Sequence, residues 1–200
     1  MRRLAFFISG TGGNALNLLA ACRDGRVPGE PVVAVGSSSK AAGIARLEAA
    51  GLPVRVVLRS AHPDDETYSE ACYEAVEAEG SEVICLCGFL KKLVVPSRWE
   101  GRILNIHPAD TKRHQGLGGY DWAFAQKLPA TKITVHLVDE GLDTGEILAQ
   151  REVDLRGADT LAEVERRGLA VEHQLYPEAL KTFLTTNYAN ITNGNQSCKS

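Results

Sequence analysis

The sequence predicts an α/β protein with three layers, in which a mostly parallel, twisted sheet lies between helices on both faces. Two observations support this fold class. Apolar runs of strand length alternate with helical stretches along the chain, and the run EVICLCGF at 82–89 is continuously apolar, as expected for a strand covered on both faces. In such sheets the carboxyl ends of the strands share one edge, and ligands bind there.

Strands and helices alternate through the first half of the chain. Strands are predicted at 3–9, 31–37, 53–58, 82–89 and 102–107. Helices are predicted at 14–23, at 40–50 and from Pro63 to Gly80, where Pro63 and three acidic residues suit a first helical turn. An irregular stretch is expected from 108 to about Gly119.

The second half of the chain departs from strict alternation. The segment 132–138 alternates between apolar and polar residues, which favours a strand near an edge, and 146–155 is expected to pair antiparallel to it. A closing pair of helices, split near Pro177, is predicted between 159 and 184. We expect one domain over 1–184 and a disordered tail over 185–200, because the tail is too polar to bury a core.

Composition narrows the partners to small molecules. The formal net charge is −3, and the basic residues are spread along the chain, which argues against nucleic acid or an anionic membrane. No segment reaches the roughly 20 apolar residues of a bilayer crossing. Five cysteines, an odd number, favour a reduced, cytoplasmic setting. The histidines lack metal-ligand spacing, so no metal is expected. The sequence does not indicate an oligomeric state.

A glycine-rich turn joins the first strand to the first helix in SGTGGNALN, residues 9–17. Amides of Gly12, Gly13 and Asn14 can approach a phosphate at the start of that helix. A dinucleotide site is disfavoured, because the second strand ends without the acid that would hold a ribose. A plain tight turn is the structural alternative.

Asn105 and His107 carry the strongest chemical signal. Residues i and i+2 of a strand face the same way, so both side chains project together where the strand ends at Pro108. A carboxamide aimed at a developing oxyanion and an imidazole that moves a proton suit acyl transfer without a covalent enzyme intermediate. The alternative is structural: His107 hydrogen-bonds to backbone and Asn105 caps the loop.

Asp143 lies in the acidic loop VDEGLDTGEIL. A carboxylate held against an imidazole orients the ring and raises its pKa, so Asp143 is a candidate partner of His107. An Asx-turn between two strands is the structural alternative. His114 lies in a loop beside this site and is a candidate substrate contact.

Five motifs together resemble the folate-dependent formyltransferases, most of all those that act on glycinamide ribonucleotide in purine synthesis. They are SGTGGN, GFLKKL, ILNIHPAD, DEGLDTGEIL and VEHQLYP, and the resemblance covers roughly residues 1–184 in order. The resemblance implies a Rossmann-like formyltransferase fold. It also implies an enzyme that takes 10-formyltetrahydrofolate as formyl donor. The acceptor amine would attack the formyl carbon directly, and tetrahydrofolate would leave from the tetrahedral intermediate.

The resemblance assigns a role to each site residue. Asn105, His107 and Asp143 are the implied catalytic residues, with Asn105 and protonated His107 stabilising the oxyanion. The acceptor's phosphate is placed on Gly12, Gly13 and Asn14, and its ribose on Glu172. The donor is placed along the following residues: Phe89, Leu90, Lys91, Leu93, Asp139 and Glu140.

Three features depart from the family pattern and leave the acceptor open. The family continues after His-Pro with Ser-Leu-Leu-Pro, whereas residues 109–118 read ADTKRHQGLG. Gly118 replaces a family histidine, and Asp65 stands where the family has a folate-binding arginine. A nucleotide-linked amino sugar is therefore the alternative acceptor, and a non-catalytic folate or nucleotide binder is a third hypothesis. A methionyl-tRNA acceptor is disfavoured, because the chain has no basic run.

Overall fold

A twisted sheet forms the centre of the computed structural model, which describes residues 1–186. Seven strands of these residues are ordered β3-β2-β1-β4-β5-β6-β7. The strands from β3 to β5 are parallel, and β6 and β7 are antiparallel to their neighbours. The predicted fold class and the antiparallel pair at one edge are confirmed. Their bounds are β1 Arg2–Ile8, β2 Gly29–Gly36, β3 Val54–Val56, β4 Val83–Leu86, β5 Ile103–His107, β6 Ala130–Leu137 and β7 Ile147–Asp154.

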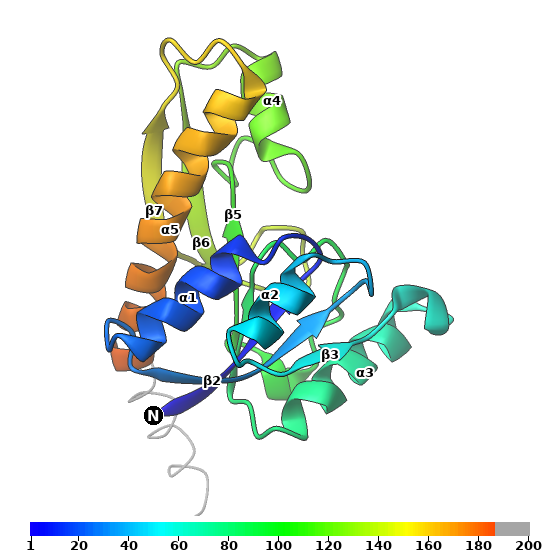
Figure 1. Cartoon of the computed structure of the whole chain (residues 1–200). Helices are drawn as coiled ribbons and strands as arrows, with labels where there is room; N and C mark the ends of the chain where they lie inside the picture. Colours follow the sequence, from blue (N-terminus) through cyan, green and yellow to red (C-terminus); the bar gives the residue numbers. More distant parts are fainter. Residues whose placement is uncertain (187–200) are drawn as a thin grey trace, which may run out of the picture.

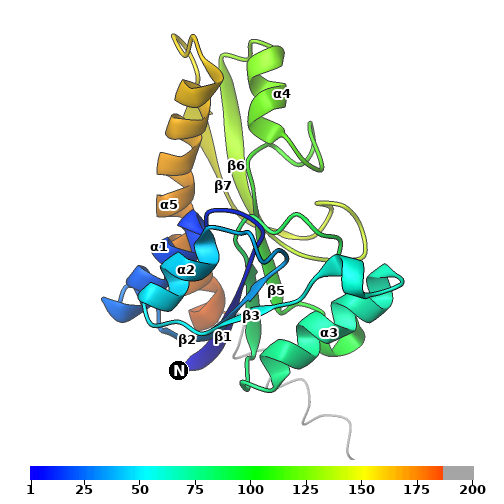
Figure 2. The same ribbon diagram turned by 45° about the vertical axis from the view of Figure 1, so that its right-hand side comes forward.

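Helices cover both faces of the sheet (Figure 1). One face carries α1 (Gly13–Arg23), α2 (Gly43–Ala49), α4 (Gly119–Ala125) and α5 (Leu161–Thr186), and the other carries α3 (Asp65–Glu77). Short 3₁₀ turns lie at Arg59–Ala61 and Ser97–Trp99. Figure 2 shows that β6, β7, α4 and the start of α5 project together beyond the rest of the sheet. No helix within residues 1–186 is long and apolar enough to cross a bilayer.

The two faces of β1 divide the core. Leu4, Phe6 and Ile8 face the α1 and α5 layer, whereas Ala5 and Phe7 face α3. All five are fully buried, which explains why the strand is apolar on both faces. Burying one such large side chain contributes about 1.5–3 kcal/mol, so this strand anchors both layers.

The closing helix differs from the prediction: α5 is continuous through Pro177 rather than split there. A proline has no N–H to donate to the carbonyl four residues earlier, which here is that of His173. The Asn17 side chain of α1 donates to that carbonyl instead, at 2.8 Å. The freed acceptor is thus satisfied from a neighbouring helix, and the helix need not end.

Other boundaries also shift. Pro63 precedes α3 rather than opening it, because Asp64 is the N-cap and accepts a hydrogen bond from the Thr67 amide at 2.8 Å. Helix α4 begins at Gly119, in a region for which no helix was predicted. Of the predicted tail, Thr185 and Thr186 belong to α5, and 187–200 lie outside the described residues.

Candidate active site

The carboxyl end of β5 brings the two predicted polar side chains together on one face of the sheet. In the antiparallel pairing with β6, Asn105 lies opposite His136 and His107 lies opposite Thr134. This is the face that α5 does not cover. The alternate residues of β6, Ile133 and Val135, point to the other face and into the core that includes α5. The strand pairing therefore adds two side chains of β6 to the site.

Asp143 reaches both residues from the loop between β6 and β7. Its Oδ1 accepts a hydrogen bond from the Asn105 amide at 3.3 Å, and its Oδ2 lies 3.4 Å from Nδ1 of His107. The Gly116 N–H donates to Oδ2 at 2.7 Å. Asp143 has a left-handed backbone, φ 54°, and its side chain is only 9% exposed. Such a backbone is uncommon outside glycine, although Asp tolerates it better than most residues.

Both ring nitrogens of His107 face oxygen atoms. Nδ1 faces Asp143, and Nε2 donates to the His114 carbonyl at 3.0 Å. Burial lowers the pKa of His107, and this outweighs the raising effects of the Asp143 charge and the His114 carbonyl. The expectation that Asp143 raises the pKa is thus right for its own contribution and wrong for the net direction. The ring is mainly neutral near pH 7. Because Nε2 already carries the proton that it donates to the His114 carbonyl, a further proton would bind Nδ1, where Asp143 can accept its hydrogen bond.

The carboxyl of Asp143 is ionised near neutral pH. Burial acts to raise its pKa, but the neighbouring His136, the hydrogen bond from the Gly116 amide and the nearby His107 together lower it. The cluster therefore pairs a buried carboxylate with a neutral imidazole, in position to stabilise that imidazole once it is protonated.

His136 is a site residue that the sequence did not reveal. Its Nδ1 donates to the Leu137 carbonyl at 2.7 Å, which leaves Nε2 as an acceptor 3.2 Å from the Asn105 amide. Its Nε2 also lies 3.3 Å from Asp143 Oδ1. Only the register of β5 on β6 places His136 here, and a single sequence does not define that register.

The glycine turn after β1 packs closely against the start of α2. Gly12 is left-handed, φ 71°, and a Cβ there would lie 3.1 Å from the Gly43 Cα of α2. The turn thus opens α1 in close contact with the start of α2. Asn14 is nine-tenths buried, and its Nδ2 donates to Glu172 at 2.6 Å. Its Oδ1 is buried without a partner among the described residues, so it can accept from a bound hydroxyl or amide.

Glu172 of α5 is buried between neutral donors. One oxygen accepts from Asn14, and the other accepts a short hydrogen bond from the Tyr120 hydroxyl. Burial raises the pKa of Glu172 despite these hydrogen bonds. A ribose at this site would therefore meet a carboxyl that Tyr120 of α4 already holds in place.

Glu172→Gln is expected to stabilise the protein above neutral pH. A raised folded-state pKa means that the native state binds more protons than the unfolded state, so stability falls as pH rises through that pKa. The amide does not titrate, so the stability of Glu172→Gln relative to the wild type should increase from pH 5 to pH 8. Each kcal/mol of that difference corresponds to about 2–4 °C in Tm. Denaturant unfolding at both pH values measures it, with the exposed Glu178→Gln as control. An advantage that is equal at both pH values would contradict the argument.

The residues assigned to the formyl donor lie on two loops at the same edge. Leu90, Lys91, Asp139 and Glu140 are exposed, and Leu93 is half-buried. Phe89 instead packs in the α3 core, with its ring edge-on to Phe7 at 5.1 Å. Asp139 stabilises its own loop by accepting from the Gly141 amide and the Thr144 hydroxyl. Asp65 forms an ion pair with Arg59 at 2.8 Å.

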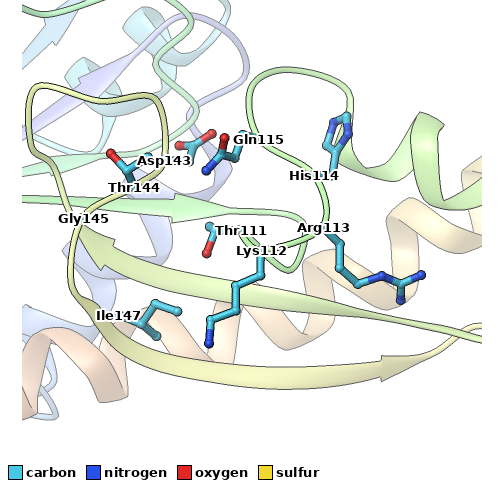
Figure 3. A pocket seen from close by; sticks show the side chains of 9 residues that line it. All are labelled: Thr111, Lys112, Arg113, His114, Gln115, Asp143, Thr144, Gly145 and Ile147. Carbon is cyan, nitrogen blue, oxygen red and sulfur yellow. The ribbon is translucent and has the colours of Figure 1, made fainter.

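A pocket of about 340 Å³ opens beside Asp143 (Figure 3). It is lined by Thr111–Gln115 of the loop after β5 and by Asp143–Gly145 and Ile147. The His114 ring stacks on Trp122 of α4, with centroids 4.9 Å apart. Within residues 1–186, no group of three or more His, Cys, Asp or Glu side chains is arranged to hold a metal ion.

The sequence matches a known family. The formyl transferase model matches residues 2–180. The chain therefore belongs to the formyl transferase family.

Solved structures and sequence relatives agree with this assignment. The fold superposes with a TM-score of 0.88 on a glycinamide ribonucleotide transformylase of Symbiobacterium toebii, at 34% identity over 92% of this chain and 87% of that one. The phosphoribosylglycinamide formyltransferase of Haemophilus influenzae is 31% identical over 92% of this chain and 87% of its own length. The human trifunctional purine biosynthetic protein adenosine-3 is 30% identical over 90% of this chain, but the chain spans only 18% of that protein.

Proposed function

We propose that this protein transfers a formyl group from 10-formyltetrahydrofolate to the amine of glycinamide ribonucleotide, a step of purine biosynthesis. The observation that carries the proposal is the buried cluster of Asn105, His107 and Asp143 at the carboxyl edge of the sheet. The names of the Haemophilus influenzae and Symbiobacterium toebii relatives support the same acceptor.

The acceptor fits the turn between β1 and α1. Amides of Gly12, Gly13 and Asn14 at a helix N-terminus suit its phosphate. The unpartnered Asn14 Oδ1 is an acceptor, which suits a ribose hydroxyl, and Glu172 lies within hydrogen-bonding distance of the same side chain. The phosphate and ribose would therefore be held together by α1 and α5.

The donor fits the opposite side of the cluster. Leu90 is 57% exposed and Leu142 is 64% exposed, on the two loops that flank the edge. Exposed leucines at an edge rich in polar groups are typical of a surface that receives an apolar ring system. The folate supplies an activated one-carbon unit, and Leu90, Lys91, Leu93 and the 139–143 loop would hold it beside His107.

The three central side chains divide the chemistry. The Asn105 amide can donate to the oxygen that gains negative charge. His107, neutral at rest, can accept the proton that the attacking amine loses. Asp143 would stabilise the resulting imidazolium through Nδ1, while the Asn105 side chain and the Gly116 amide keep the carboxylate in place. No side chain needs to form a covalent bond to the formyl group.

The remaining proposals concern the setting of this activity. We propose small-molecule substrates only, with neither nucleic acid nor membrane as a partner, because the net charge is −3 and the basic residues are dispersed. We propose the cytoplasm as the location, since Cys22, Cys72, Cys85 and Cys87 are free thiols. Residues 1–184 are proposed as the formyltransferase domain.

A transfer assay tests the proposal. The protein would be incubated with 10-formyltetrahydrofolate and glycinamide ribonucleotide, and release of tetrahydrofolate and formation of the formylated product would be followed. A nucleotide-linked amino sugar would be offered in parallel. Formylation of the amino sugar alone would reject the purine acceptor, and folate binding without transfer to either amine would reject the enzyme.

Gly12→Val is expected to impair the acceptor site selectively. A β-branched residue is strained at φ 71°, and its Cβ would press on Gly43. Strain of about 1–3 kcal/mol should raise KM for the acceptor by roughly 5- to 150-fold and leave KM for the folate nearly unchanged. Gly10→Ala is the control, because a Cβ there meets no atom within 4 Å. Equal increases in both KM values would contradict the phosphate assignment.

A further inference from the structure

Asp110 is a largely buried carboxylate that the proposed chemistry does not use. It follows β5 by three residues, and its side chain is only 14% exposed. Its Oδ2 forms an ion pair with Lys132 of β6 at 2.9 Å. Its Oδ1 accepts from the Lys112 amide at 3.1 Å and lies 3.5 Å from the Gln150 amide nitrogen of β7. Asp110 thus connects the loop after β5 to the two edge strands.

Its neighbours secure the same connection. The fully buried Thr134 of β6 donates to the Ala109 carbonyl at 2.7 Å and accepts from Gln150 at 2.9 Å. The Asp110 carbonyl accepts from the amides of Arg113 and His114, at 2.8 and 2.9 Å, which closes a tight turn. The beginning of the loop is therefore fixed on the sheet face that α5 leaves uncovered.

The other end of this turn meets the catalytic cluster. Four residues after Asp110, the His114 carbonyl accepts from His107; two residues later, the Gly116 amide donates to Asp143. These two backbone groups and the carboxylate anchor lie on one short segment, so a displacement at Asp110 is transmitted to both. Burial acts to raise the pKa of Asp110, but Lys132, the Lys112 amide and Gln150 together lower it. The Asp110 carboxyl is therefore ionised, as its ion pair with Lys132 requires.

We propose that Asp110 is a positioning residue: by binding Lys132 and Gln150 it holds loop 108–118 where the His114 carbonyl orients His107 and the Gly116 amide orients Asp143. The inference rests on the proposed function only in taking His107 and Asp143 as the reacting groups. A misplacement of about 1 Å in such a site can lower the rate by about 100-fold.

The test compares Asp110→Ala, Asp110→Asn and Lys132→Gln with wild type. Asp110→Ala is expected to lower kcat by about 10- to 100-fold, with smaller changes in KM for either substrate. Asp110→Asn keeps an acceptor for the Lys112 amide and should lose less. Glu178→Gln is the matched control, since it removes an ion pair of 2.6 Å from β7 on the opposite face and should leave kcat unchanged.

Two readouts separate positioning from general destabilisation. Hydrogen exchange at the Gly116 amide should quicken by about tenfold or more once the loop is released, while exchange in β1 stays unchanged. The pKa of His107, followed by NMR, should shift from its wild-type value, because the loop contributes both to the burial that lowers this pKa and to the His114 hydrogen bond that raises it. The charged or titratable groups that face this ring are Asp143, His136 and His114. Should Asp110→Ala fail to fold, Lys132→Gln carries the same expectations from a half-exposed site.

Wild-type kcat in Asp110→Ala or Lys132→Gln would overturn the proposal. So would lost activity with unchanged Gly116 exchange and His107 titration, because Asp110 would then act by another route. If the wild type formylates neither amine, the proposed function fails, yet the exchange and titration measurements still decide whether Asp110 positions the loop.

Discussion

Replacing His107 by alanine is expected to lower kcat by about 10²- to 10⁴-fold, the usual contribution of a positioned proton acceptor. The ring contacts Asp143 at Nδ1 and the His114 carbonyl at Nε2, so no neighbouring group can take its place without moving the loop. The loss should appear in kcat rather than in KM, since the phosphate turn and the flanking loops are left intact. Steady-state kinetics with both substrates measures it.

The control for this variant is His62→Ala. His62 packs edge-on against Tyr68, with centroids 5.8 Å apart, and it does not belong to the cluster around His107. Its removal should leave kcat close to wild type. If His107→Ala retained wild-type turnover, the structural reading would prevail, in which His107 only satisfies the loop backbone.

The architecture was predictable because its signals are local. An apolar run such as 82–89 identifies a strand covered on both faces, and the glycines of 9–17 mark a tight turn between the first strand and the first helix. The i and i+2 relation placed Asn105 and His107 on one face without any tertiary information. These inferences use only neighbouring residues, and the structure agrees with them.

Features that depend on distant partners were not predictable. The continuity of α5 needs the Asn17 side chain to replace a lost donor, over a sequence separation of 156 residues. The presence of His136 in the site needs the β5–β6 register. The net shift of the His107 pKa was also not predictable: pairing with Asp143 was expected to raise the pKa, but burial, which depends on the whole fold, lowers it.

The position of loop 108–118 could likewise not be predicted from its own residues. Its polar residues read as a mobile connection, yet Asp110 is held by two edge strands and the His114 ring lies between His107 and Trp122. A turn can be inferred from composition, but its docking depends on Lys132 and Gln150, which follow 22 and 40 residues later. Polar loops with buried charges are thus where sequence reasoning is weakest and where site residues were missed.

Asp143→Asn is expected to lower kcat by about 10³- to 10⁴-fold while leaving the fold intact. Asn tolerates a left-handed backbone as well as Asp does, so the φ of 54° adds no new strain. The amide oxygen can still accept from the Gly116 N–H, and the amide nitrogen can donate to Nε2 of His136, the position that Oδ1 faces. What is lost is the charge, together with the Oδ1 acceptor of the Asn105 amide. Loss of the carboxylate partner of a catalytic imidazole can reduce kcat by about 10⁴-fold in Ser-His-Asp enzymes.

The pKa of His107 shows whether charge is the cause. Asp143 raises that pKa against the effect of burial, so in Asp143→Asn the pKa should fall further below its value in the wild type. Asp159→Asn, at an exposed position before α5, controls for removal of a negative charge and should change neither kcat nor the titration. A His107 pKa that stays constant or rises would mean that the carboxylate does not stabilise the imidazolium. In that case the low activity of the variant would have to come from a displaced loop, because Gly116 is held by the same side chain.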